Sequence, residues 1–193
     1  MCRSHIQVLQ HIKEMTEKEL EIELLSSHWI KFEDDDKDLC SHGQVRVRIG
    51  QEIIVDEGEK ENFWTTSAMA VHLLRTLKEN HNSENPVGEH LIPCCGHHID
   101  HLEGEENVHI QGCMTGHNFW VEHNNDKVIL TTDNGTKVQL PFEDYKEEVL
   151  SFVDKVEDLY RTSKPKKLPK DDYDRIGYEM MREEWEKRRN EIK

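Results

Sequence analysis

Apolar and polar residues alternate along several stretches of the chain, and this pattern predicts β-strands. QVRVRIGQEIIVD at 44–56 alternates through β-branched residues around Gly50, a turn or bulge, and HWIKF at 28–32 is a further strand candidate. The acidic residues 33–38 between them are predicted to form a solvated turn. EHLIPCC and NVHIQGC each predict a short buried strand. From Asn118 onward, NFWVEH, KVILTT and TKVQLP are separated by turn residues that include Asn134-Gly135, so we expect an antiparallel meander at about 117–140.

Four other stretches carry apolar residues three and four positions apart, which is the spacing of a helix with one buried face. They are residues 4–25, with Ser4 as a cap; residues 65–81, with a hydroxyl cap at Thr65, Thr66 or Ser67; about 143–161; and a last helix capped by Asp171 or Asp172. The contact residues predicted for the last helix are Tyr173, Ile176, Met180 and Trp185.

The strands come in runs and do not alternate strictly with helices. The predicted fold class is therefore α+β: a mostly antiparallel sheet packed by helices, with a C-terminal helix. The basic, proline-punctuated stretch SKPKKLPK precedes that helix. We therefore expect a single α+β domain over 1–160, including the N-terminal helical segment, and a basic linker plus C-terminal helix over 161–193. The charge of this last helix favours packing on the body or on a second copy, which would make a homodimer.

Charge is distributed unevenly along the chain. The 193 residues carry a net charge of −15, but residues 161–193 hold 11 Lys/Arg against 8 Asp/Glu, a balance of +3 that leaves −18 for residues 1–160. Such an acidic body repels phosphate backbones and anionic headgroups, so nucleic-acid and membrane binding are both disfavoured. A basic protein partner would be attracted to it, although solubility alone also accounts for a charged surface.

The cysteine count and the start of the sequence bear on location. MCRSHIQVLQ lacks the apolar core and small-residue cleavage site of a secretion signal, and no apolar run approaches the about 18 residues of a membrane span. Five cysteines, an odd number, favour reduced thiols over a disulfide framework. We therefore expect a cytoplasmic protein.

HLIPCCGHHIDH at 90–101 concentrates metal-ligand side chains more than any other stretch of the chain. Cys94-x2-His97 is followed, after fifteen residues, by Cys113-x3-His117. Two short-spaced pairs of this kind are typical of a structural zinc site, in which two tight turns meet to complete a tetrahedron, and thiolate and imidazole suit zinc. The predicted ligands are Cys94, His97, Cys113 and His117, with His123 as an alternative. The other interpretation is that Cys94, Cys95 and Cys113 are small core residues.

Strand geometry narrows the ligand set. His117 and His123 would lie about 20 Å apart on one strand at about 3.3 Å per residue, so they cannot share an ion. In an extended segment Cys94 and Cys95 point to opposite sides, so at most one is expected to be a ligand. His90, His98, His101 and His109 rank as replacements. A cysteine nucleophile is disfavoured because no elbow or helix N-terminus places a thiol in an activating field.

LIPCCGH at 91–97, GC-x2-G at 112–116 and WVEH at 120–123 resemble a group of small bacterial proteins without an established activity. The resemblance covers about residues 60–165 and implies a shared fold but no substrate. It implies that the motif positions are Cys94, Cys95, Gly96, His97, Gly112, Cys113, Gly116, Trp120 and His123. His117 is not part of this pattern, which favours His123 or a purely structural role.

Two functions follow as hypotheses from different classes. The first is a non-enzymatic, acidic, cytosolic binding protein that docks a basic protein partner, in the manner of immunity or antitoxin proteins. The second is a zinc protein with a Cys/His site around residues 94–123, either structural or hydrolytic. The sequence contains no phosphate-binding glycine loop, dinucleotide fingerprint or HExxH motif, so neither nucleotide enzymes nor zincin proteases are supported.

Overall fold

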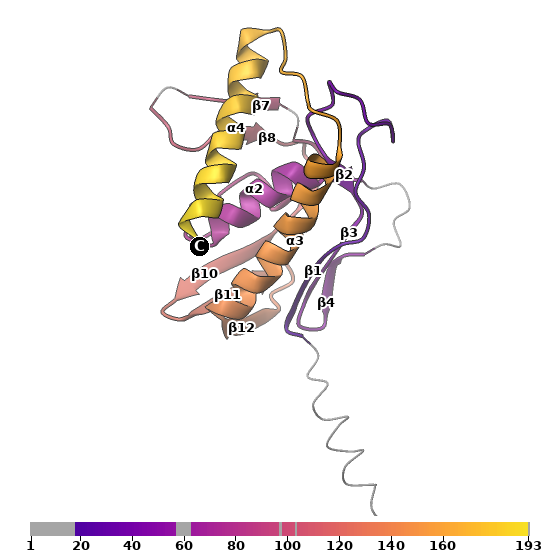
Figure 1. The fold of residues 1–193 in the computed structure, drawn as a ribbon. Coiled ribbons are helices and arrows are strands. Elements are labelled where there is room, and N and C mark those ends of the chain that lie inside the picture. Colours follow the sequence, from indigo (N-terminus) through magenta and orange to yellow (C-terminus); the bar gives the residue numbers. More distant parts are fainter. Residues whose placement is uncertain (1–17, 57–62, 97, 103, 193) are drawn as a thin grey trace, which may run out of the picture.

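A computed structural model describes residues 18–56, 63–96, 98–102 and 104–192 (Figure 1). Within these residues the chain forms three helices and several strand pairs, every one of them antiparallel, which confirms the α+β class. No helix of the described chain has the length and apolar composition that crossing a membrane requires.

The first three-stranded sheet has the order β1-β3-β4. It is built from β1 (Leu20–Leu24), β3 (Val45–Ile49) and β4 (Glu52–Val55), with Leu20 opposite Ile49. The helix predicted over 4–25 is therefore wrong over Leu20–Leu24, and residues 4–17 lie outside the described residues. Leu20 and Ile22 are two positions apart and both buried, so they fit the inner face of a strand. Gly50 forms the expected turn between β3 and β4, at φ +57°.

HWIKF does not form a strand. It makes a single bridge, from His28 to His42, and then turns at Phe32 with φ +58°. The acidic residues after it do not form the free solvated turn that was expected, because they bind the basic linker. Lys166 Nζ lies 2.9 Å from Asp34 Oδ1 and 3.3 Å from the centre of a Trp29 ring. The linker thus returns to the body.

The predicted meander is confirmed. It consists of β10 (Phe119–Asn124), β11 (Lys127–Thr132) and β12 (Lys137–Pro141), in that order across the sheet. Gly135, at φ +87°, makes the second turn. Three further two-stranded pairs occur: β2 (His42–Gly43) with β5 (Trp64–Thr65), β6 (Ile92–Pro93) with β9 (Gly116–His117), and β7 (His98–Asp100) with β8 (His109–Gln111).

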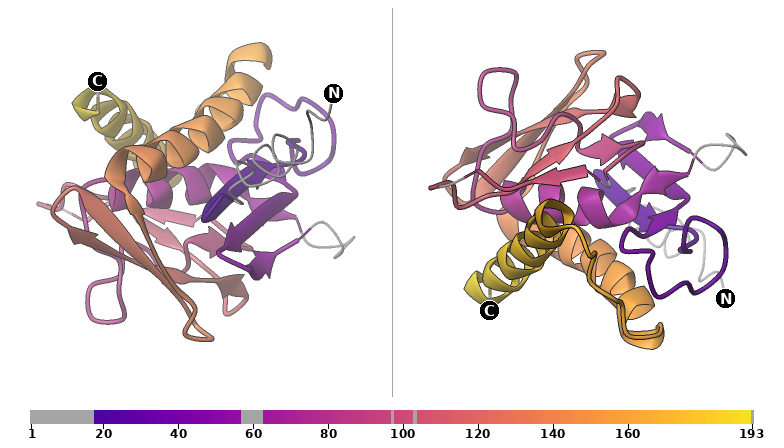
Figure 2. Two further views of the ribbon diagram at one scale, coloured as in Figure 1. Left: turned by 90° about the horizontal axis from the view of Figure 1, so that it is seen from below. Right: turned by 90° about the horizontal axis from the view of Figure 1, so that it is seen from above.

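Helix α2 (Thr66–Thr76) is the centre of the fold, and all eleven of its residues are buried. Figure 2 shows α3 (Phe142–Thr162) and α4 (Asp172–Glu191) together on one side of α2, and α3 also packs on β1 and on strands β11 and β12 of the meander. The predicted helices at 65–81 and 143–161 are confirmed, the first ending earlier than expected. The buried face of α3 carries Tyr145, Val149, Phe152, Val153 and Val156.

Helix α4 packs on α2 and β7 of the body, with the predicted cap Asp171 accepting hydrogen bonds from the backbone N–H groups of Tyr173 and Asp174. The predicted contact face is wrong in part, because Tyr173 and Ile176 are exposed. The buried residues are Gly177, Tyr178, Met181, Glu184 and Arg188. A homodimer through α4 stays a prediction, and it would have to use the face that this packing leaves free.

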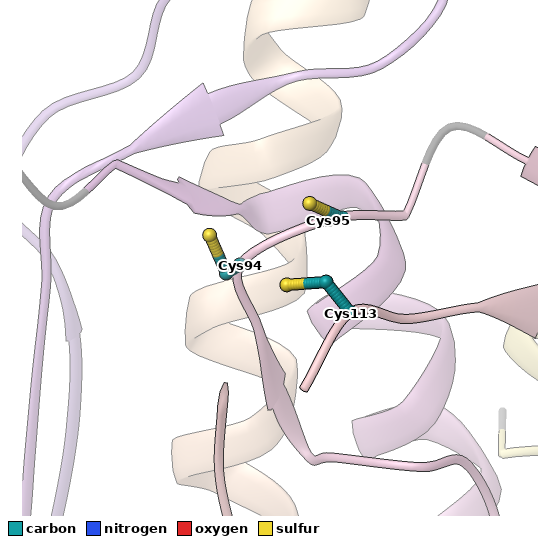
Figure 3. A group of neighbouring side chains, drawn as sticks. All are labelled: Cys94, Cys95 and Cys113. Atoms are coloured by element: carbon teal, nitrogen blue, oxygen red, sulfur yellow. The ribbon is translucent and has the colours of Figure 1, made fainter. Parts of the chain in front are cut away.

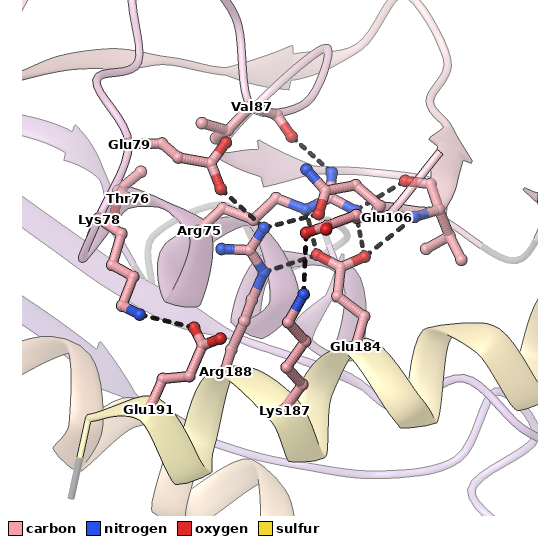
Figure 4. A network of polar contacts seen from close by, with 12 residues as sticks. Arg75, Thr76, Lys78, Glu79, Val87, Glu106, Glu184, Lys187, Arg188 and Glu191 are labelled. Carbon is pink, nitrogen blue, oxygen red and sulfur yellow. Dashed lines mark hydrogen bonds and ion pairs between the residues drawn. The ribbon is translucent and has the colours of Figure 1, made fainter. Parts of the chain in front are cut away.

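The contact between α2 and α4 includes a buried charged network (Figure 4). Arg75 of α2 and Glu184 of α4 are each 4% exposed and form a two-pronged ion pair at 2.7 and 2.8 Å. Arg188 Nε donates to the same carboxylate at 2.7 Å. Because a buried carboxylate is costly unless fully hydrogen-bonded, this network fixes where α4 docks.

Candidate metal centre

Two segments that are distant in sequence meet at the end of β6. β6 pairs with β9, placing Pro93 opposite Gly116, and the Cys94 N–H continues the contact by donating to the Thr115 carbonyl at 3.3 Å. Residues 94–96 and 113–115 therefore run side by side immediately beyond the strand pair. Gly116 is required there, because a Cβ on it would lie 2.5 Å from the His90 ring.

Three cysteines converge at this junction. The Sγ atoms of Cys94, Cys95 and Cys113 all lie within 4.8 Å of one another, and each residue is half-buried. Figure 3 shows the first two on one segment and Cys113 reaching toward them from the other. The expectation that Cys94 and Cys95 point to opposite sides is wrong. It assumed an extended chain, whereas β6 ends at Pro93 and the chain bends at Cys94.

The segment that carries Cys94 and Cys95 packs against the start of α2. A Cβ added to Gly96 would lie 2.5 Å from the Ala68 Cβ, so only glycine lets the backbone lie this close to the first turn of the helix. The Thr65 hydroxyl, predicted to cap α2, instead donates to the Cys94 carbonyl at 3.0 Å.

The three thiols do not titrate alike. The pKa of Cys113 is lowered, first by hydrogen bonding with the backbone of Thr115 and then by hydrogen bonds from Cys95 and Cys94. The pKa of Cys95 is raised to about 12, first by its hydrogen bond to Cys113 and then by burial. Burial, followed by the charge of Cys113, raises the pKa of Cys94. Cys113 is therefore the most acidic of the three thiols, and a bound cation would favour the loss of the other two protons.

The predicted histidines are distributed differently. His97 lies outside the described residues. His117 is on β9 opposite Ile92, with its ring 5.1 Å from that of Trp64. His123 Nε2 contacts the Thr76 carbonyl at 2.8 Å, at the far end of α2, about 16 Å along the helix from its start at 1.5 Å per residue. Among the described residues, no histidine or carboxylate joins the three sulfur atoms.

The remaining cysteine that the structure describes is a core residue. Cys40 is 7% exposed, its Sγ lies 3.7 Å from the Gly96 carbonyl, and burial raises its pKa to about 12. Sequence reasoning missed Cys95 as a member of the group. The available signal was Pro93 immediately before the pair, because a proline donates no hydrogen bond and is a common place for a strand to end.

Comparison of the chain with protein families, with curated proteins and with solved structures finds no match in any of the three.

Proposed function

We propose that this protein binds one thiophilic metal ion, zinc by preference, through Cys94, Cys95 and Cys113. The observation that carries the proposal is the convergence of three Sγ atoms within 4.8 Å. Tetrahedral zinc with Zn–S bonds of about 2.3 Å separates its sulfur ligands by about 3.8 Å. The three thiols would need to close by only about an ångström, and thiolate is the ligand type that selects zinc over magnesium or calcium.

A structural role fits the surroundings of the site better than a hydrolytic one. The ion would join the β6–β7 connection to the β8–β9 connection, which have little regular structure of their own. Binding free energy at such a site becomes folding free energy. The fourth ligand of the ion would be a water molecule, a small ligand from solution, or His97. Of these, His97 is the one that the sequence predicts. Replacing His97 with alanine distinguishes these cases. If His97 is the fourth ligand, the variant should bind zinc more weakly; if the fourth ligand is water, the zinc affinity should not change.

The test is metal content per chain for protein purified without chelators, followed by zinc titration of the apo-protein. We expect about one equivalent of zinc in the wild type and little in Cys113→Ser or Cys95→Ser. Cys40→Ala is the matched control, because it removes a nearby thiol from outside the cluster. Absence of zinc binding by the reduced wild type would refute the proposal, and full binding by Cys95→Ser would remove that residue from the site.

Zinc should also stabilise the fold by mass action. At a free concentration a hundred times the Kd, binding adds about 2.7 kcal/mol to the free energy of unfolding. The melting temperature of the apo-protein should therefore rise with added zinc and should not rise in Cys113→Ser. If an activity is found that is lost in the variant while stability is unchanged, the site is catalytic.

A second candidate function is docking of a basic protein, as an acidic immunity-like protein would do. It is favoured by the exposed side of α3, where Glu143, Asp144, Glu147, Asp154 and Asp158 follow one another at the surface. Electrostatic steering toward such a surface speeds association and weakens with salt.

The docking proposal is tested by capture from the source organism with the full chain as bait. We expect a basic protein that is released by moderate salt and is lost with Asp144→Lys plus Glu147→Lys, two exposed positions of α3 that make no contact with the described residues of α4. The control exchanges Glu122 and Asp133, exposed acidic residues of the meander, for lysine. Equal capture by both double variants would count against α3 as the docking surface.

A further inference from the structure

A groove separate from the cysteine cluster lies between the C-terminal half of α3, the linker and α4. Its cavity volume is about 760 Å³, within the range of small-molecule sites. Three aromatic side chains line it: Tyr160, Tyr178 and Trp185. Such a lining offers a flat apolar surface with polar groups at its edge.

The walls of the groove are held by polar contacts. Trp185 Nε1 donates to Glu157 Oε1 at 2.6 Å, and Arg189 Nε lies 3.1 Å from the same oxygen, which joins α4 to α3. The Tyr160 hydroxyl donates to the Leu39 carbonyl at 2.8 Å, so Tyr160 contributes its ring, and not a free hydroxyl, to the lining of the groove. The site is therefore formed before any ligand arrives, which lowers the entropic cost of binding.

Two cations at the groove make no tight ion pair with the described residues, although Asp34 and Asp36 lie near Lys164, and Glu186 lies near Arg182. The Lys164 ammonium donates to the Asp34 carbonyl at 3.2 Å and forms no ion pair with a described carboxylate. Arg182 reaches Glu186 only at 3.8 Å, and both side chains are more than half exposed. Exposed pairs of this kind are weak, so Arg182 is free to exchange its partner.

Tyr178 supplies a second, independent observation. Its side chain is 4% exposed and lines the groove, yet no described residue hydrogen-bonds to its hydroxyl. The hydroxyl is not one of the buried polar atoms that lack a partner, so it is open to the groove and available to donate to a ligand there. Burial raises the pKa of Tyr178, and the positive charge of Arg182, which lines the same groove, acts against this rise.

We propose that this groove binds a small anionic amphiphile, with a planar apolar group against Trp185 and Tyr160 and an acid group that takes hydrogen bonds from Tyr178 and Arg182. Lys164 adds positive charge at the rim. An acid group would accept a hydrogen bond from the Tyr178 hydroxyl and also pair with Arg182, whose contact with Glu186 is long and exposed; a neutral ligand could accept the hydrogen bond but would gain no ion pair. This site is independent of the proposed metal centre.

The probe is anilinonaphthalene sulfonate, which combines fused aromatic rings with one acid group, titrated into the folded, full-length protein. We expect one site per chain, a shift of the Trp185 indole N–H resonance on binding, and affinity that falls with salt. Phenylnaphthylamine, which has the same rings without the acid, should bind at least about tenfold more weakly because it gains no charge-assisted hydrogen bond.

Three variants make the test specific to the groove. Arg182→Glu should raise the Kd about tenfold or more, whereas Arg161→Glu, the same charge change at an exposed α3 position outside the lining, should leave it nearly unchanged. Tyr178→Phe should weaken binding without loss of thermal stability, because its hydroxyl has no internal partner to lose. Equal affinity in Arg182→Glu and Arg161→Glu, or equal binding of the neutral probe, would overturn the proposal.

Discussion

Replacing Glu184 with glutamine tests what fixes α4 on the body. The carboxylate accepts four hydrogen bonds: Oε1 from Arg75 Nε and Arg188 Nε at 2.7 Å each, and Oε2 from Arg75 Nη2 at 2.8 Å and Val108 N at 3.0 Å. Glutamine has nearly the same shape but one acceptor oxygen, so two of the four bonds are lost and an N–H₂ group faces donors. Arg75 would also keep a buried charge without its counter-ion.

The expected loss is large. Hydrogen bonds to charged groups contribute about 1.5–3 kcal/mol each, and breaking a buried ion pair costs about 3–5 kcal/mol. We therefore expect Glu184→Gln to lower the free energy of unfolding by about 3–5 kcal/mol. At about 2–4 °C per kcal/mol for a chain of this size, the melting temperature should fall by roughly 6–20 °C.

Urea unfolding at pH 7 measures this loss, with Glu106→Gln as the control. Glu106 forms an exposed ion pair with Lys187, which lies on α4 as Glu184 does. Removing this exposed pair should leave the free energy of unfolding unchanged. The reasoning is refuted if Glu184→Gln is no more destabilising than the control.

Acid provides a second check on Glu184. Burial acts to raise its pKa, but hydrogen bonds and charge from Arg75 outweigh this, and the pKa in the folded protein is lowered. The stabilisation is therefore complete above the unfolded pKa of about 4.3 and is lost as pH falls through the folded value. The difference between wild type and Glu184→Gln should narrow over that range, and a constant difference would contradict the assignment of the effect to charge.

Two further predictions concern packing and pH. Gly177→Ala should destabilise the protein, because the added Cβ would lie 2.0 Å from the Ile99 carbonyl oxygen. This clash should outweigh the helix preference of alanine over glycine, which is about 1 kcal/mol. Thermal melting should show a lower melting temperature for Gly177→Ala than for the control Glu183→Ala, an exposed position on the same helix. Burial, followed by the charge of Arg75, lowers the pKa of His72 to about 3, so the unfolded chain binds a proton near pH 6.5 that the folded chain does not. Through His72 the free energy of unfolding should thus fall by about 2 kcal/mol between pH 7 and pH 5, and in paired denaturation curves the fall should be smaller by this amount in His72→Gln.

The elements predicted best are those in which local pattern and final environment agree. The meander has alternating residues and an Asn-Gly turn, and α3 has one apolar face at helical spacing, so each element defines its own buried side. The N-terminal prediction failed because it continued a helical pattern from Ser4 as far as residue 25, although Leu20 and Ile22 are two positions apart and so fit a strand. Their pairing with Ile49 and Val47, some 25 residues away in the chain, makes them a strand.

The candidate site was predicted in part. Cys94 and Cys113 were paired by their spacing, and the structure brings them together, but it adds Cys95 and leaves His123 at the opposite end of α2. The direction of a cysteine side chain depends on where a strand ends, and the end of β6 depends on its pairing with β9. Sequence spacing does not contain that information.

The sequence by itself determined the α+β class, most of the helices, the meander and the acidic body, because local propensity, turn residues and charge are properties of neighbouring residues. Only the tertiary structure decided which face of α4 is buried, which partner the acidic turn binds and which thiols converge. Each of these depends on contacts between residues far apart in the chain. The Arg75–Glu184 pair, separated by 109 positions, is the clearest case. From the sequence each residue would be expected to be exposed to solvent, but in the fold the two are buried against each other and belong to the core.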